Sequence, residues 1–295
     1  MRRTIASAII IFWSLSAFAA GTAGSNGQTA VRHVVDVPFE PVCQLGVGFV
    51  PSSSVEGYGD VSMVETEGNW AFAHLWNIFR GDLDLALRLN ATFLSDSAGS
   101  VLPGQLVRTM LDVGWSLNLG DGACVQARLF PGIYSDLRDL GGSLYMPFSL
   151  AMVMSVNPSL SEIVGLEVRP GFSTELMPLI GVVWMIDNRT WLDARLPESR
   201  LAYYLGQGWS TYLGFKWQNL SFAMKENEIR AEQITLEDFR LFCGAAYRVS
   251  DDVQFSGEIG RVVGRSFEFD DVAGADHELD VSPATFVRFS VGGPF

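Results

Sequence analysis

The chain has 295 residues, of which 48% are hydrophobic, and its formal net charge is −13. This acidic balance argues against nucleic-acid binding, which needs a basic face. Mean hydropathy is +0.21, high for a chain that folds in water. Beyond the N-terminal region, however, no stretch approaches the roughly 20 apolar residues of a membrane-spanning helix.

The N-terminus carries the pattern of a secretory signal peptide. Two arginines open the chain, an apolar run covers 5–18, and Ala17-Phe18-Ala19 forms a small-x-small cleavage pattern. We expect 1–19 to be cleaved on export and 20–41 to form a periplasmic segment. An N-terminal membrane anchor is the alternative, but the run is short for a span and small residues follow it.

An exported, apolar chain without spanning helices points to a closed β-barrel, because only helices and closed barrels satisfy every backbone group in lipid. The three cysteines, Cys43, Cys124 and Cys243, fit this interpretation as small hydrophobic residues of the barrel wall. Their odd number leaves at least one thiol unpaired, and one disulfide is the alternative. Their spacing matches no metal site, so we expect no metal and no cofactor.

The clearest strand pattern covers 82–94, where apolar residues occupy every second position and mostly polar or small residues the positions between. A helix would scatter these leucines around its axis. The same alternation recurs through 105–119, and Gly120-Asp121-Gly122 then gives strong hairpin chemistry. The predicted strands suit the ~9–11 residues of a tilted membrane strand. A soluble sandwich remains the alternative for each strand taken alone.

Residues 42–295 are therefore predicted to form an all-β, transmembrane, antiparallel up-and-down β-barrel. An even strand number puts both ends of the barrel on the periplasmic side, with long outer connections at 51–79, 188–200 and 264–283. If two short segments are not separate spans, the count is ten. The main prediction has about 12 strands, at 42–50, 80–94, 105–119, 123–134, 143–156, 161–175, 179–187, 201–217, 219–226, 237–249, 253–263 and 284–295.

The last strand alternates apolar residues, including Phe289 and Val291, and ends in Phe295. This ending resembles the insertion signal of bacterial outer-membrane β-barrel proteins, although Pro294 departs from the pattern. The resemblance implies an outer-membrane location, lipid as surroundings, and recognition by the barrel-assembly machinery. In general style the chain is similar to small porin and OmpW-type barrels, without assignment to a subfamily.

The strand phase predicts which charged residues face the interior. Because their signs are mixed, we expect a narrow, passive channel for small solutes. A structural or host-interaction barrel that acts through its outer loops, like an adhesin, is the alternative. The predicted lumen-facing residues are Asp82, Asp84, Arg88, Arg108, Asp112, Arg128, Glu167, Arg169, Glu175, Lys216, Arg240, Arg248, Glu258 and Arg288.

Catalysis is weakly supported, and we expect no enzyme. Omptin proteases are barrels of about this size that use paired aspartates and an Asp/His couple, which Asp82 with Asp84 and Asp276 with His277 resemble only in part. Asp276 and His277 are adjacent rather than separated, and the two aspartates fit plain lumen positions. No histidine falls within a predicted strand, so a phospholipase-like site is not indicated either.

Overall fold

The computed structural model describes residues 42–55, 58–96, 102–138, 140, 142–225, 231–271 and 277–294. The predicted signal peptide at 1–19, the segment 20–41 and Phe295 lie outside these residues. Within the described part of the chain, no helix is long and apolar enough to cross a membrane.

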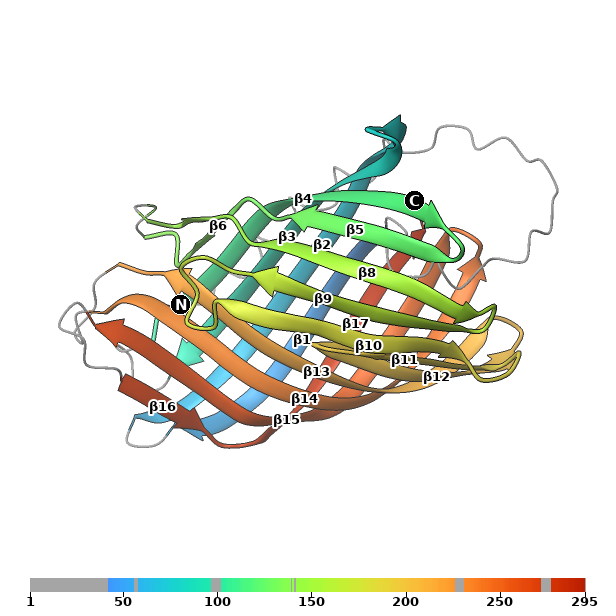
Figure 1. Cartoon of the computed structure of the whole chain (residues 1–295). Coiled ribbons are helices and arrows are strands. Elements are labelled where there is room, and N and C mark those ends of the chain that lie inside the picture. The colour runs from blue at the N-terminus through green and yellow to red at the C-terminus, as the bar shows by residue number, and fades with distance from the viewer. Residues whose placement is uncertain are drawn as a thin grey trace. The chain divides into compact units, whose positions relative to one another are not determined.

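The described residues form a β-barrel of strands inclined around a common axis (Figure 1). The 17 strands are β1 (Val42–Val55), β2 (Gly59–Ile78), β3 (Gly81–Asp96), β4 (Gln105–Gly120), β5 (Ala123–Leu129), β6 (Gly132–Ser135), β7 (Leu144–Tyr145), β8 (Phe148–Asn157), β9 (Leu160–Val168), β10 (Leu176–Met185), β11 (Thr190–Arg195), β12 (Glu198–Gly206), β13 (Trp209–Ala223), β14 (Ala231–Ser250), β15 (Val253–Asp271), β16 (His277–Val281) and β17 (Ala284–Pro294).

Antiparallel pairing closes the barrel between its first and last strands. β1 pairs with β17 from Val42 opposite Pro294 to Phe49 opposite Val287. Three pairs of short strands, β5 with β6, β7 with β8, and β16 with β17, each follow one another along the wall, so the barrel has 14 strand positions. Closure leaves the sheet without a continuous free edge.

Prolines mark the breaks within these composite strands, because proline cannot donate to the ladder. Pro131 separates β5 from β6, and Pro147 separates β7 from β8. Their carbonyl groups still bond across the wall: the Phe130 N–H donates to the oxygen of Pro147 at 2.8 Å, and the Leu111 N–H to that of Pro131 at 3.0 Å.

The predicted count of 12 strands, or 10, is wrong, because the sequence pattern hid two strands of the barrel. β2 replaces most of the expected loop 51–79, and β11 lies within the expected loop 188–200. Two bulges in β2 shift the phase of its alternation, and β11 is only 6 residues long. The expected break at 218–219 is also wrong, because β13 runs through it.

The extra strands change which connections share an end. Tight turns at 121–122, 158–159, 207–208 and 251–252 all lie at the end of the barrel where β1 begins and β17 ends, here called the turn end. The opposite end, with the 169–175 connection, is called the loop end. In the turn at 186–189, the Asp187 carboxylate accepts an N–H bond from Arg189 at 2.7 Å, and such bonds lower the pKa of this carboxyl group.

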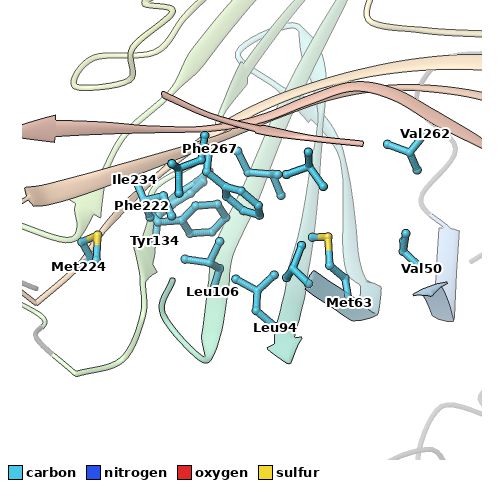
Figure 2. Close-up of a cluster of buried hydrophobic side chains, with 14 of the residues drawn as sticks. Val50, Met63, Leu94, Leu106, Tyr134, Phe222, Met224, Ile234, Val262 and Phe267 are labelled. Atoms are coloured by element: carbon cyan, nitrogen blue, oxygen red, sulfur yellow. The ribbon is translucent and has the colours of Figure 1, made fainter. Parts of the chain in front are cut away.

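Toward the loop end, inward-facing apolar side chains from most of the strands pack into one cluster, here called the apolar layer (Figure 2). These side chains are almost fully buried, with relative exposures of 0–3% at its centre. Burial of this size is the main favourable term available to the fold. Central members of the layer are Val50, Met63, Leu106, Phe222, Ile234 and Phe267.

The outer surface is apolar as well, since alternate residues of each strand point outward. Leu150, Val164, Ile180 and Ile259 are all more than half exposed. Glu162, near the 158–159 turn, is an exposed charge that marks one edge of this apolar belt. A belt of this kind suits lipid contact.

We predict that Leu150→Arg lowers the free energy of unfolding in lipid vesicles by about 2–4 kcal/mol, because an outward arginine at mid-belt must enter hydrocarbon. The matched control is Val156→Arg, at an equally exposed outward position close to the turn end, where the cost falls to about 0–1 kcal/mol. Equal effects in denaturant titrations would show that the belt is misplaced.

Candidate functional site

Between the apolar layer and the turn end, charged side chains from strands all around the barrel point inward, and together they form what we call the charged layer. Strand alternation puts them there: Glu65 and Glu67 lie opposite the inward positions of β3, while Val64, next to Glu65, is exposed on the outer surface. The layer is the one part of the described structure where many ionisable groups meet, so it is the candidate functional site.

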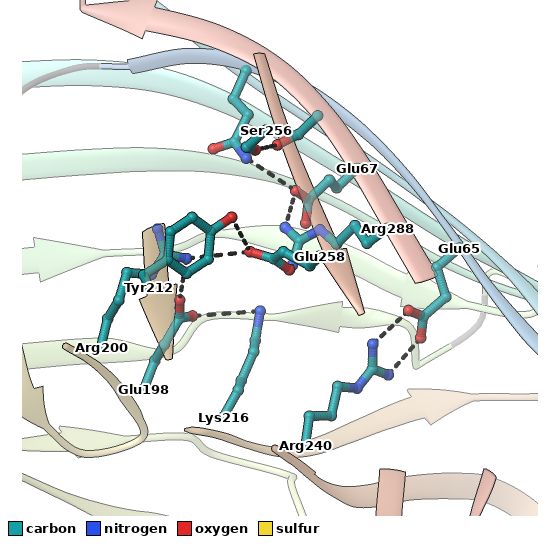
Figure 3. Close-up of polar contacts among 12 residues, drawn as sticks. Glu65, Glu67, Glu198, Arg200, Tyr212, Lys216, Arg240, Ser256, Glu258 and Arg288 are labelled. Carbon is teal, nitrogen blue, oxygen red and sulfur yellow. Dashed lines mark hydrogen bonds and ion pairs between the residues drawn. The ribbon is translucent and has the colours of Figure 1, made fainter. Parts of the chain in front are cut away.

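Arg240 on β14 is the centre of the most buried part of the charged layer (Figure 3). Its guanidinium donates to both Glu65 oxygens, at 2.5 and 2.6 Å, and to Asp238 at 2.7 Å. Asp238 is fully buried and also meets Arg265 at 3.5 Å. Because Glu65 lies on β2, the Arg240–Glu65 pair bridges strands that are not neighbours in the wall.

Glu258 on β15 is the centre of a second network in the same figure. Its carboxylate accepts a hydrogen bond from the Tyr212 hydroxyl at 3.0 Å and pairs with Arg200 at 3.5 Å and Arg288 at 3.6 Å. Arg288 also pairs with Glu67. The Arg200–Glu258 contact crosses from β12 to β15, so ion pairs narrow the interior on this side.

Around Asp112, the wall formed by β3, β4 and β5 carries three guanidinium groups, those of Arg88, Arg108 and Arg128, beside this one carboxylate, whereas Asp82 and Asp84 lie nearer the turn end. Arg88 and Arg128 both bond to one buried carboxylate, Asp112, with Arg128 at 2.9 Å. Both guanidinium groups also lie over the Phe130 ring, at 5.7 and 5.6 Å from its centroid. Arg108 donates to the Asn90 side-chain oxygen at 2.8 Å. The local field therefore favours anions at this wall.

Nearer the turn end, His74 Nδ1 contacts a carboxylate oxygen of Asp84, and the two side chains are partly exposed. The prediction that no histidine falls within a strand is wrong, because His74 lies on β2 and His277 on β16. His33 and Asp276 lie outside the described residues. Among the residues the structure describes, no group of three or more His, Cys, Asp or Glu side chains could hold a metal ion.

Most of the predicted lumen residues belong to the charged layer or to its border at the turn end. Asp82 accepts the Asn77 N–H at the β2–β3 turn, at 3.1 Å, and Arg248 lies exposed near the turn end. Glu175 is exposed in the 169–175 connection rather than on a strand. The predicted residues within the charged layer are Arg88, Arg108, Asp112, Arg128, Glu167, Lys216, Arg240, Glu258 and Arg288.

Arg169, which was predicted to face the lumen, is almost fully buried. Its Nη1 donates to the backbone oxygen of Asn219 on β13 at 2.7 Å, and its Nε to that of Thr174 at 3.0 Å. Of the insertion signal, Phe289 is exposed on the outer surface, while Phe295 lies outside the described residues.

Sequence reasoning missed members of the charged layer on strands that it did not recognise or whose bounds it misplaced. These residues are Glu65, Glu67, Glu198, Arg200, Asp238 and Arg265. The two glutamates at alternate positions after Met63 and Val64 are compatible with a strand, but the whole segment 51–79 was predicted to be a loop.

Comparison with known proteins gives only distant likenesses. No family model and no curated protein matches the chain. A COG4313 outer membrane channel from Pseudomonas putida F1 is 14% identical, with a TM-score of 0.43 over 84% of this chain and 94% of that chain. The NanC porin is 8% identical, with a TM-score of 0.39 over 86% of this chain and 100% of that chain. The Pseudomonas putida toluene transporter TodX is 10% identical, with a TM-score of 0.37 over 92% of this chain and 94% of that chain. These likenesses are weak, so the conclusions below are drawn from the chain's own residues.

We predict that Asp238→Asn lowers the free energy of unfolding by about 3–5 kcal/mol, because it leaves the buried guanidinium groups of Arg240 and Arg265 with a neutral partner. Glu198→Gln is the matched control, since Glu198 is 44% exposed and an exposed pair contributes about 0–1 kcal/mol. Denaturant titration in detergent micelles measures both. A small loss for Asp238→Asn would mean that solvent reaches this cluster.

Proposed function

We propose that this protein is a passive channel for small solutes in a bacterial outer membrane. The observation that carries the proposal is the contrast between the two layers of the interior. Side chains at the centre of the apolar layer are 0–3% exposed, whereas those of Arg88, Arg128 and Arg200 in the charged layer are 32%, 22% and 36% exposed. Solvent therefore reaches inward-facing groups in the charged layer.

The location is supported by the outer surface and by the sequence. A closed barrel with an apolar belt satisfies its backbone internally and presents hydrocarbon to lipid. The predicted signal peptide provides export, and the alternating last strand supports insertion by the barrel-assembly machinery.

The two layers make different demands on a solute. In the charged layer, fixed charges hold water and set the local concentration of counter-ions. The excess of guanidinium groups near Asp112 favours small anions and polar groups that accept hydrogen bonds. The apolar layer acts as a constriction that is unfavourable to bare ions. The arrangement suits small solutes that combine a polar group with an apolar body.

We predict a measurable but small conductance for the purified protein in planar bilayers. Arg88→Gln together with Arg128→Gln should shift the reversal potential toward cation selectivity in a salt gradient, because the inner wall then loses two positive charges. The control, Arg189→Gln, removes a charge from the exposed turn at 186–189 and leaves the interior unchanged.

The competing function is a structural or interaction barrel that binds a partner through the loop end, without passage of solutes. It would be favoured if the wild-type protein neither conducts ions nor admits small solutes to proteoliposomes, while an external partner binds it and replacement of the exposed loop-end residues Leu137 and Leu140 abolishes that binding. That result would overturn the channel proposal.

A further inference from the structure

The barrel wall is incomplete between β10 and β13. The intervening hairpin of β11 and β12 ends where Arg195 lies opposite Gly181 and Glu198 lies opposite Lys216. Beyond the backbone bonds from Leu196 to Ile180 and from Trp217 to Pro197, 176–179 of β10 pair with β9 on one side alone among the described residues. Likewise 218–222 of β13 pair with β14 alone, until Ala223 pairs with Ser135 of β6. Toward the loop end, the wall therefore has a gap bordered by two strand edges.

The sequence of β10 fits an edge at this position. The carbonyl oxygen of Ile180 points to the gap side of β10 and accepts a hydrogen bond from the Leu196 N–H at 3.1 Å. The backbone N–H and C=O groups of alternate residues point to the same side of a strand. The nitrogen of Pro178, which carries no hydrogen, therefore also faces the gap. The outward side chains of Leu176 and Ile180 are 58% and 54% exposed, which places this border within the apolar belt.

The segment 169–175, here called the plug, fills the gap and bonds to β13 and β14. The Arg169 guanidinium reaches the Asn219 carbonyl oxygen, the Ser173 N–H donates to Ser221 Oγ at 3.1 Å, and the Gln233 side chain donates to the Gly171 oxygen at 2.7 Å. These contacts replace strand pairing with isolated bonds from side chains and from a short loop.

The burial of polar outward residues shows that the plug covers the outer side of β13. Phe222 belongs to the inner apolar layer, so its neighbour Ser221, like Asn219, points outward. Ser221 and Asn219 are nevertheless only 0% and 2% exposed. Polar groups on a bare barrel surface would face hydrocarbon, which is costly, and the plug prevents this.

Behind the plug lies an aromatic cluster that is part of the apolar layer. Phe172 of the plug contacts Tyr134 and Tyr145, with ring centroids 5.4 and 5.2 Å apart, and Tyr134 lies 6.3 Å from Phe222. The Arg169 guanidinium lies 5.3 Å from the centre of the Phe172 ring. Displacement of the plug would therefore connect the apolar layer directly with the lipid-facing surface.

We propose that the gap between β10 and β13 is a side passage, closed by the plug, through which neutral, poorly water-soluble molecules move between the apolar layer and the surrounding lipid. The aromatic and aliphatic lining selects this class of solute, since it offers an apolar body dispersion and ring contacts. The proposal deepens the proposed channel function and rests on it.

A reversible disulfide across the gap tests the side passage. Ser173→Cys with Ser221→Cys brings two thiols to residues already in contact, and mass spectrometry verifies the link. The matched control is Ser155→Cys with Ser161→Cys, two residues whose hydroxyl oxygens are 3.2 Å apart on the paired strands β8 and β9. The readout is uptake of the apolar dye N-phenyl-1-naphthylamine by intact bacteria that carry each variant in the outer membrane.

With the gap pair oxidised, uptake should fall to that of cells without the protein, and a reductant should restore it; the control pair should show neither effect. Ion conductance in planar bilayers should be the same in the oxidised and reduced forms. Equal dye uptake in both forms of the gap pair, with conductance intact, would overturn the side passage and leave the channel proposal standing. A wild-type protein that gives neither uptake nor conductance would overturn both.

Discussion

The structure depends on the need to satisfy backbone hydrogen bonds without water. In lipid, each unpaired N–H or C=O group costs several kcal/mol, so the sheet has to close, and β1 pairs with β17 along most of its length to do so. The gap between β10 and β13 is the exception, because the strand edges that border it have no partner strand and need other partners. There, Arg169 and the Leu196-Pro197 turn provide the bonds that a strand would otherwise make.

The same need for internal partners organises the interior. Inward charges would be unfavourable without opposite charges nearby, and the Arg240–Glu65 and Arg200–Glu258 pairs provide them by bridging strands that are not neighbours. The apolar layer needs no such pairing and packs closely toward the loop end. A solute on the barrel axis therefore meets two chemically different zones, and the side passage would open from the apolar one.

Strict alternation predicted β3 and β4 well, because their outward leucines and inward polar residues differ sharply. β2 was hidden by bulges between Ala71 and Ala73 and between Leu75 and Ile78, which shift its phase. Leu94 and Leu106 face inward although they are apolar, since near the loop end the interior is filled by the apolar layer. Arg169 bonds to β13 because β11 and β12 are too short to fill the wall at that level. No local sequence pattern predicts this.

Amide hydrogen exchange of the protein in lipid nanodiscs tests the central claim, a closed wall with one plugged gap, most directly. The amides of Leu45 and Val47, on the β1–β17 seam, should belong to the slowest class, as paired strands in a membrane should. The amide of Ser173, which donates to a side chain at the gap, should exchange much faster. Equally slow exchange at Ser173, or fast exchange along the seam, would contradict this account.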